Sequence, residues 1–146
     1  MRRQGFSAVI RHWSGDYVGL PWQFAGRSRA GVDCWGLFWL VYRDVLGIEI
    51  ASYAQETIDA PEREQIAALL ESDRNRSPWR PVDTEQPFDM AVFRRAGIES
   101  HVGLVIEPGR MLHILHGGES CIERFDQGRW RPKLIGLHRH ESLLRA

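Results

Sequence analysis

The stretch 31–45 constrains the fold more than any other part of the sequence, because it joins a helix start to a continuous apolar stripe. Asp33 is a favoured N-cap residue, since its carboxylate can accept hydrogen bonds from first-turn N–H groups, and Gly47 can end a helix. The residues after Asp33 repeat at the spacing of one buried helix face: Cys34, Leu37, Phe38, Val41, Tyr42 and Val45. The pattern predicts a helix from Cys34 to about Leu46 that packs on a core.

Cys34 opens this predicted helix, and its position allows two interpretations. A thiol in the first turn of a helix feels the positive end of the helix dipole, which favours the nucleophilic thiolate. A single cysteine on an apolar stripe is, however, more often a small buried hydrophobic residue than a nucleophile. A catalytic role therefore requires a base elsewhere in the chain, and the sequence offers histidines downstream.

Composition places the chain among ordinary globular proteins. Its 146 residues fit a single domain, 1–146, and 43% of them are hydrophobic and 26% charged. The 19 basic and 19 acidic residues cancel, so the net charge gives no reason to expect a nucleic acid or an anionic membrane as partner.

The cysteines and the N-terminus exclude further classes of protein. Cys34 and Cys121 are too few for a disulfide framework, and no C-x-x-C spacing indicates a metal site, so we expect no metal and no cofactor. Residues 1–12 lack the apolar run of a signal peptide, and no segment is long enough to span a membrane. We expect synthesis in the cytoplasm without a signal peptide, and no membrane insertion.

The rest of the chain divides into helical and extended segments. Apolar spacing predicts helices over 6–13 and 61–72, with a loop over 17–31 and a polar surface connection over 73–87. Strand-like patterns then follow over 90–94, 101–106, 111–115, 121–125 and 134–138. This order predicts an α+β domain, with N-terminal helices packed on one face of an antiparallel sheet of about five strands.

Three histidines lie on the predicted hairpin of this sheet. His101 begins one strand, whereas His113 and His116 lie beyond the turn. A cysteine at a helix start, a histidine on a strand and a polar residue that orients the histidine form the triad of a thiol hydrolase. In such a site Cys34 is the nucleophile, and His101 accepts its proton and later protonates the leaving amine.

The turn leaves the third residue open between His113 and His116. A two-residue turn between Glu107 and Arg110 places His101 opposite His116 and directs His113 to the other face of the sheet. A left-handed bulge at the glycine of this turn shifts the register by one residue and places His113 on the face of His101. The proline of the turn disfavours the bulged loop, so turn chemistry alone favours His116.

Five segments carry a resemblance to a known family: Gly19-Leu-Pro-Trp22, Asp33-Cys-Trp-Gly-Leu37, Gln86-Pro-Phe-Asp-Met-Ala-Val-Phe93, His101-Val-Gly-Leu-Val and Arg110-Met-Leu-His113. Their order over residues 5–138 resembles that of the NlpC/P60 cysteine peptidases, papain-like enzymes that cut bacterial cell-wall peptides. The version carried by tailed phages and gene transfer agents is the most similar. The resemblance implies a papain-like NlpC/P60 fold.

The resemblance also implies site residues. It assigns Cys34, His101 and His113 to the catalytic triad, which leaves His116 as the alternative third residue. It assigns three further residues to the oxyanion and substrate-binding region: Trp22, Asp33 and Trp35. The sequence departs from the family where Trp22 replaces a frequent Tyr, Trp35 a frequent Ser and Phe88 a frequent Gly. Since a tryptophan can donate only its indole N–H, the backbone N–H of Cys34 is the other expected oxyanion donor.

The function implied by the resemblance is thiol-dependent hydrolysis of peptidoglycan stem peptides after D-glutamate, through a thioester on Cys34. The expected partners are the peptidoglycan peptide and phage-tail or tail-hub proteins. The expected location is a virion or particle tail that acts in the periplasm or cell wall. The alternatives are a structural tail-tip protein with a vestigial hydrolase site and a contact-dependent toxin amidase of similar fold.

Overall fold

The structure is a computed structural model that describes residues 12–52, 78–95 and 98–144. Its described α-helix, α2, spans Cys34–Val41 and continues into a π-helical turn, Tyr42–Leu46. The described strands are β1 (Arg27–Ser28), β2 (Gly31–Val32), β3 (Trp79–Val82), β4 (Met90–Arg95), β5 (Ile98–Glu107), β6 (Arg110–His113), β7 (Cys121–Arg124) and β8 (Leu134–His140). Short 3-10 turns lie at Trp13–Tyr17, Arg131–Lys133 and Glu141–Leu143. The predicted helix over 61–72 and most of the one over 6–13 lie outside the described residues.

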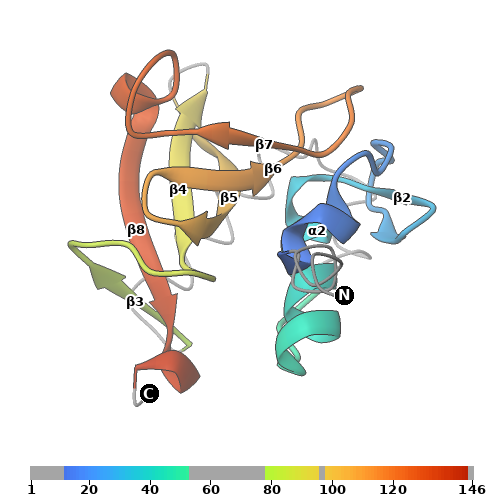
Figure 1. Ribbon diagram of the computed structural model, residues 1–146, viewed down its shortest axis with the longest axis horizontal. Coiled ribbons are helices and arrows are strands. Elements are labelled where there is room, and N and C mark those ends of the chain that lie inside the picture. The colour runs from blue at the N-terminus through green and yellow to red at the C-terminus, as the bar shows by residue number, and fades with distance from the viewer. Residues whose placement is uncertain (1–11, 53–77, 96–97, 145–146) are drawn as a thin grey trace, which may run out of the picture.

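Six strands form one antiparallel sheet in the order β3-β8-β4-β5-β6-β7, and β1 pairs with β2 separately (Figure 1). Strands β4 to β8 are the five that the sequence predicts, so the α+β fold class is confirmed. The prediction was wrong to treat 73–87 as a surface connection only, because β3 lies within it. Pro81 is compatible with this strand because β3 is at the edge of the sheet.

Alternate residues of the strands pack into two apolar clusters. On β4, Met90 and Val92 join the cluster that contains α2, whereas Ala91 and Phe93 join a second cluster with Trp130. Helix α2 is buried on nearly all sides and contacts β5 and β6. Burying one large apolar side chain contributes about 1.5–3 kcal/mol, so this packing fixes α2 against the two strands that carry the predicted histidines.

The end of the helical segment agrees with the prediction. Gly47 follows Leu46 with φ of +67°, and its N–H donates to the carbonyl of Tyr42. A left-handed residue of this kind ends a helix most readily when it is glycine, because a side chain would be strained there.

Phe88 adopts a φ of +76°, a conformation that favours glycine. Its N–H donates to the carbonyl of Val105 at 2.7 Å, and its ring stacks on Trp13 with centroids 5.1 Å apart. A non-glycine residue in this region costs about 1–3 kcal/mol. The hydrogen bond to Val105 and the packing on Trp13 therefore hold the phenylalanine in a conformation that a glycine would adopt at lower cost.

The β5–β6 hairpin combines a two-residue turn with a bulge. Glu107 pairs with Arg110 across the turn, and Gly109 has φ of +84°. The register then shifts by one residue, so that Val105 pairs with Met111. The predicted shift is confirmed, but its predicted place at Gly109 was wrong, because the bulge lies within β5. Since the strand absorbs the extra residue, the turn keeps the short form that its proline favours.

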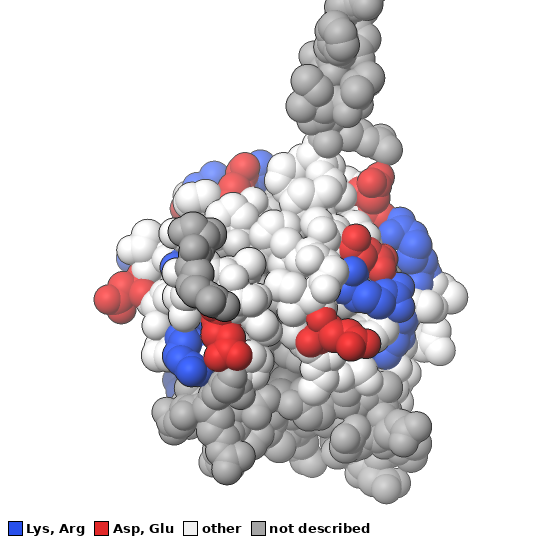
Figure 2. Space-filling view, turned by 90° about the horizontal axis from the view of Figure 1, so that it is seen from below, with Lys and Arg blue, Asp and Glu red and all other residues white. Residues whose placement is uncertain are grey.

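Charged residues of both signs lie on one face of the molecule (Figure 2). Figure 2 shows one face of the molecule with side chains of both signs around its rim and uncharged residues at its centre. On the described part of this face the charges do not gather into one patch of a single sign, in agreement with the net charge of zero. Within the described ranges, no helix is both long and apolar enough to cross a membrane.

Candidate active site

The start of α2 is fixed by a buried polar network centred on Asp33. Its Oδ1 accepts a hydrogen bond from the N–H of Gly36 at 2.7 Å and pairs with Arg27 at 2.8 Å. The bond from Gly36 confirms the predicted N-cap, and Oδ2 also accepts from the N–H of Ala25 at 3.0 Å. Because the Asp33 side chain is only 1% exposed, these bonds lie in a low dielectric and hold the first turn, with Cys34, in one position.

Gly36 allows the loop before β1 to approach this turn. A Cβ at Gly36 would lie 2.0 Å from the carbonyl oxygen of Gly26, a distance at which no side chain fits. The close approach brings Arg27 to Asp33 and extends Arg27 to the carbonyl of Ser52 at 2.7 Å. The glycine two residues after Cys34 is thus required by the packing around the helix start.

Cys34 is not part of a disulfide and lies, 2% exposed, at the first position of α2. Its thiol therefore lies in the turn where the helix dipole favours a thiolate. Since α2 contacts both β5 and β6, the structure brings the helix of the predicted nucleophile against the strands of the predicted base and its partner.

His101 on β5 and His113 on β6 form a buried histidine pair. The Nε2 atom of His101 lies 2.9 Å from Nδ1 of His113, and each residue is 1% exposed. The shifted register makes this contact possible, because it places both side chains on one face. His116 is exposed and contacts Trp22 instead. The structure therefore places His113, which the resemblance implies as the third residue, in contact with His101. It does not place His116 there, although turn chemistry favours it.

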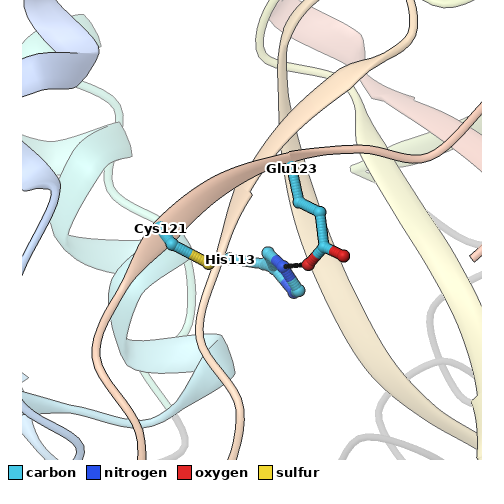
Figure 3. Close-up of side chains that lie close together, drawn as sticks. All are labelled: His113, Cys121 and Glu123. Atoms are coloured by element: carbon cyan, nitrogen blue, oxygen red, sulfur yellow. Dashed lines mark hydrogen bonds and ion pairs between the residues drawn. The ribbon is translucent and has the colours of Figure 1, made fainter.

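Glu123 on β7 extends the histidine pair. Its Oε1 lies 2.9 Å from Nε2 of His113 (Figure 3), and Arg129 donates to its two oxygens at 3.0 and 3.2 Å. Burial raises the pKa of this carboxyl, but the hydrogen bonds from Arg129 and His113 outweigh burial and hold the pKa at about 2. Burial lowers the pKa of His113, although Glu123 acts in the opposite direction. At neutral pH Glu123 is therefore a carboxylate beside a neutral imidazole.

Trp130 covers the histidine pair. Its ring stacks on His101 with centroids 5.0 Å apart and planes 21° apart, and meets His113 edge-on at 5.1 Å and 90°. Trp130 is itself 2% exposed. An apolar wall of this kind keeps water from the imidazole contacts and strengthens their electrostatic interactions.

Trp22 offers an unpaired donor near the helix start. Its backbone forms a bridge with Val32, two residues before Cys34, and its ring centroid lies 4.1 Å from that of His116. The indole Nε1 atom is buried and has no hydrogen-bond partner among the described residues. Buried donors without partners are rare, so this unsatisfied N–H distinguishes Trp22 from Trp35, whose indole N–H has a protein partner.

The two other residues implied to bind substrate have protein partners. Trp35 is 2% exposed, stacks on Phe38 at 5.4 Å and donates its indole N–H to the carbonyl of Ala51 at 2.8 Å. Asp33 is buried, and the network described above uses both of its oxygens. Both side chains support the helix start, and their contact with a substrate stays a prediction that this geometry does not favour.

A group on β6 and β7 could hold a metal ion. His113, Cys121 and Glu123 offer ligand atoms that all lie within 4.8 Å of one another (Figure 3). A metal would have to displace the hydrogen bonds that Glu123 already accepts from His113 and Arg129. Cys121 is exposed as a residue, but partial burial of its sulfur raises the pKa of the thiol, and the charge of Glu123 acts in the same direction, so this thiol is a weak ligand and a weak nucleophile.

Glu123, Arg129 and Trp130 are the site residues that the sequence reasoning missed. Strand alternation in 121–125 already places Glu123 on the face of Cys121. The missing information was the pairing of β6 with β7, in which Cys121 lies opposite His113. Nothing in the sequence pattern indicated that the segment after β7 would return over the histidine pair.

Comparison with known proteins decides the family. The model of the NlpC/P60 family matches residues 19–139, which include the start of α2 and the strands of both buried histidines. The chain belongs to the NlpC/P60 family. The family resemblance inferred from the five sequence segments is thus confirmed.

Relatives of this NlpC/P60 domain agree with the assignment. The gamma-DL-glutamyl hydrolase of Bacillus subtilis is 25% identical over 131 residues, which cover 87% of this chain and 28% of that protein, so the chain spans about a quarter of the relative's length. The structure of an NlpC/P60 family protein from Bacillus cereus matches with a TM-score of 0.63 and 22% identity, covering 87% of this chain and 37% of that one. The NlpC/p60 domain of the peptidoglycan hydrolase SagA matches with a TM-score of 0.56 and 19% identity, covering 85% and 90%. These structural matches show a shared fold.

Proposed function

We propose that this NlpC/P60 domain is a thiol-dependent hydrolase that cleaves an amide bond in peptidoglycan stem peptides. The observation that carries the proposal is the 2.9 Å contact between His101 and His113, on the two strands against which the helix of Cys34 packs. These are the parts of a nucleophile, base and orienting-residue triad. The names of two relatives, a gamma-DL-glutamyl hydrolase and a peptidoglycan hydrolase, support the same class of substrate.

The first half of the reaction acylates the enzyme. Because Nε2 of His101 faces His113, Nδ1 of His101 is the nitrogen that takes the proton from the Cys34 thiol. The thiolate attacks the carbonyl carbon of the amide, and a negative charge develops on its oxygen. The backbone N–H of Cys34 and the indole N–H of Trp22 are the proposed donors to that oxygen, supported by the orphan state of the Trp22 indole among the described residues.

Collapse of the tetrahedral intermediate then completes the acylation, and hydrolysis of the thioester releases the second product. The imidazolium of His101 gives its proton to the amide nitrogen, the C–N bond breaks, and the amine leaves while the acyl group stays on Cys34 as a thioester. Water then attacks the thioester as His101 takes a proton from it. The C–S bond breaks, the acid product leaves, and His101 returns its proton to sulfur to restore the Cys34 thiol.

Purified peptidoglycan tests the reaction directly. We expect the protein to clear peptidoglycan in zymography, and mass analysis of the fragments to show cleavage after D-glutamate. The Cys34→Ser variant is the matched control and should give no fragments. Intact peptidoglycan with the unmodified protein would contradict the hydrolase proposal and favour a vestigial tail-tip role. Cleavage at another amide bond would contradict the assigned bond alone.

The proposed setting is the tail of a phage or gene transfer agent, where the domain opens the cell wall during DNA delivery. Its support is the resemblance of the chain, through the order of its five segments, to the version of the family carried by such particles. Purified particles should contain the protein together with tail-hub proteins, detected by mass spectrometry. A cleaved, secreted monomer in the medium would contradict this setting.

A further inference from the structure

Glu123 has no role in the triad, yet it ends a line of polar side chains that starts at the proposed base. The line runs from His101 through His113 to Glu123, with both contacts at 2.9 Å, across the adjacent strands β5, β6 and β7. Figure 3 shows the carboxylate directed at the ring of His113. Arg129 holds the carboxylate from its other side through both oxygens.

Hydrogen-bond chemistry gives this line a direction. An ionised carboxylate only accepts, so the Nε2 atom of His113 must carry the proton that it shares with Glu123. A neutral imidazole has one N–H, so Nδ1 of His113 is an acceptor and Nε2 of His101 must donate to it. The proton of neutral His101 is then on Nε2, and its Nδ1 carries a lone pair.

We propose that Glu123 is a positioning residue that sets the direction of both imidazole hydrogen bonds and thereby keeps Nδ1 of His101 free of a proton, ready to act as the base. This inference rests on the proposed function, in which that nitrogen accepts the proton of Cys34. Without a carboxylate at this position, His113 can turn its hydrogen bonds around. His101 would then carry its proton on Nδ1 and could not act as the base.

The burial and the charges around His101 and His113 favour this direction of their hydrogen bonds. His101 and His113 are each 1% exposed beneath Trp130, so water does not offer them alternative partners. Among the described residues, the charged groups near the line include Glu123 itself, Arg129 bonded to it, and Lys133, whose ammonium lies 5.4 Å from the centre of the Trp130 ring. The Cys121 thiol faces His113 from the paired position on β7. Glu123 is the negative charge of this set, and it stabilises an imidazolium on His101 across one intervening ring.

The Glu123→Gln variant tests this role, because a glutamine has the same shape but can either donate or accept through its amide. We expect kcat on peptidoglycan fragments to fall about 10- to 100-fold, as for other residues that orient a catalytic group, while KM stays nearly unchanged. The acid limb of the kcat/KM profile should move to lower pH, because the pKa of His101, which must be unprotonated to act as the base, falls when its imidazolium loses the nearby negative charge. Glu123→Asp keeps the carboxylate and should recover part of the rate.

Glu107→Gln is the matched control, since this carboxylate lies at the turn of the same hairpin and pairs with Arg110 on the surface. It should leave kcat and the pH profile unchanged. A Glu123→Gln variant with the kcat and pH profile of the unmodified protein would overturn the inference. Equal loss of rate in Glu123→Asp and Glu123→Gln, with an unshifted pH profile in both, would indicate a structural role and would also overturn it.

Nitrogen-15 NMR of the imidazoles separates this inference from the proposed function. In Cys34→Ser protein we expect His101 and His113 each to be protonated on Nε2 and unprotonated on Nδ1. In the Cys34→Ser, Glu123→Gln double variant, the Nδ1-protonated form of His113 should become detectable. This readout needs no hydrolysis, so failure to cleave peptidoglycan with the expected tautomers would defeat only the proposed function. Unchanged tautomers in the double variant would defeat the inference.

Discussion

Two polar networks flank the candidate site, and they differ in which property of the site they determine. Around the helix start, Asp33 joins Arg27 to backbone N–H groups, and its side chain is 1% exposed. On the sheet, His101 and His113 lead outward to Glu123, whose side chain is 29% exposed. The helix-start network consists of a fixed ion pair and backbone donors, whereas the sheet network contains rings that exchange protons. The first therefore sets position and stability, and the second sets proton affinity.

The largest loss of activity is expected when Cys34 or His101 is replaced, because the two networks position these residues. Cys34→Ser replaces the nucleophilic sulfur with a group of similar size, so hydrolysis should fall by about 10⁴-fold or more while the fold is kept. His101→Ala should lose nearly as much. Dye release from labelled peptidoglycan and a thermal melt of each variant measure the two properties. Undiminished cleavage by Cys34→Ser would rule out the thiol mechanism.

Breaking the helix-start network should instead appear as a loss of stability. Asp33→Ala leaves Arg27 buried without its partner and removes the N-cap, so the free energy of unfolding should fall by about 3–5 kcal/mol. Glu107→Ala, which breaks an exposed pair with Arg110, should cost at most about 1 kcal/mol. Urea denaturation compares the two variants. Equal losses would show that the buried pair does not hold the helix start.

The sheet network should respond in turnover more than in stability. His113→Ala removes the orienting partner of His101, so kcat should fall about 10- to 100-fold. His113→Asn should restore part of the rate, because an amide can also fix a tautomer. His116→Ala should be mild, since His116 lies on the surface against Trp22. The opposite ranking of the two alanine variants would mean that His116 is the third residue.

The sheet network should also make stability depend on pH through Glu123. Its pKa in the folded protein is about 2, below the ordinary value of 4.5, so its contribution is fully present above about pH 4.5 and is lost as the pH falls toward 2. Unfolding of the unmodified protein and of Glu123→Gln at several pH values measures this. The difference between them should shrink across that window. A difference that stays constant with pH would contradict the depressed pKa.

The smallest effect is expected at the second cysteine. Cys121→Ser should leave both activity and stability nearly unchanged, because the thiol is exposed, unbridged and kept in its neutral form by a raised pKa. The same assays as for Cys34→Ser give the comparison within one protein. A large loss in Cys121→Ser would show that the sheet network depends on this thiol.

Local interactions explain what could be predicted from the sequence by itself. The Asp33 cap, the helix that begins at Cys34 and the left-handed Gly47 depend on contacts within a few residues. The five predicted strands depend on alternation with a period of two, which is also visible along the chain. Candidates for the nucleophile and the base could therefore be named from the sequence, and the fold class with them, whereas the sequence pattern left the third residue open between His113 and His116.

The tertiary structure decided what depends on contacts between distant segments. The bulge lies within β5 rather than at the turn, because the strand tolerates an extra residue more easily than the turn tolerates its proline in a bulged loop. The pairing of β6 with β7 brings Glu123 to His113, and the chain after β7 returns to place Trp130 over both histidines. The strand register and the path of the chain after β7 depend on packing across the whole sheet. No single stretch of sequence contains that information.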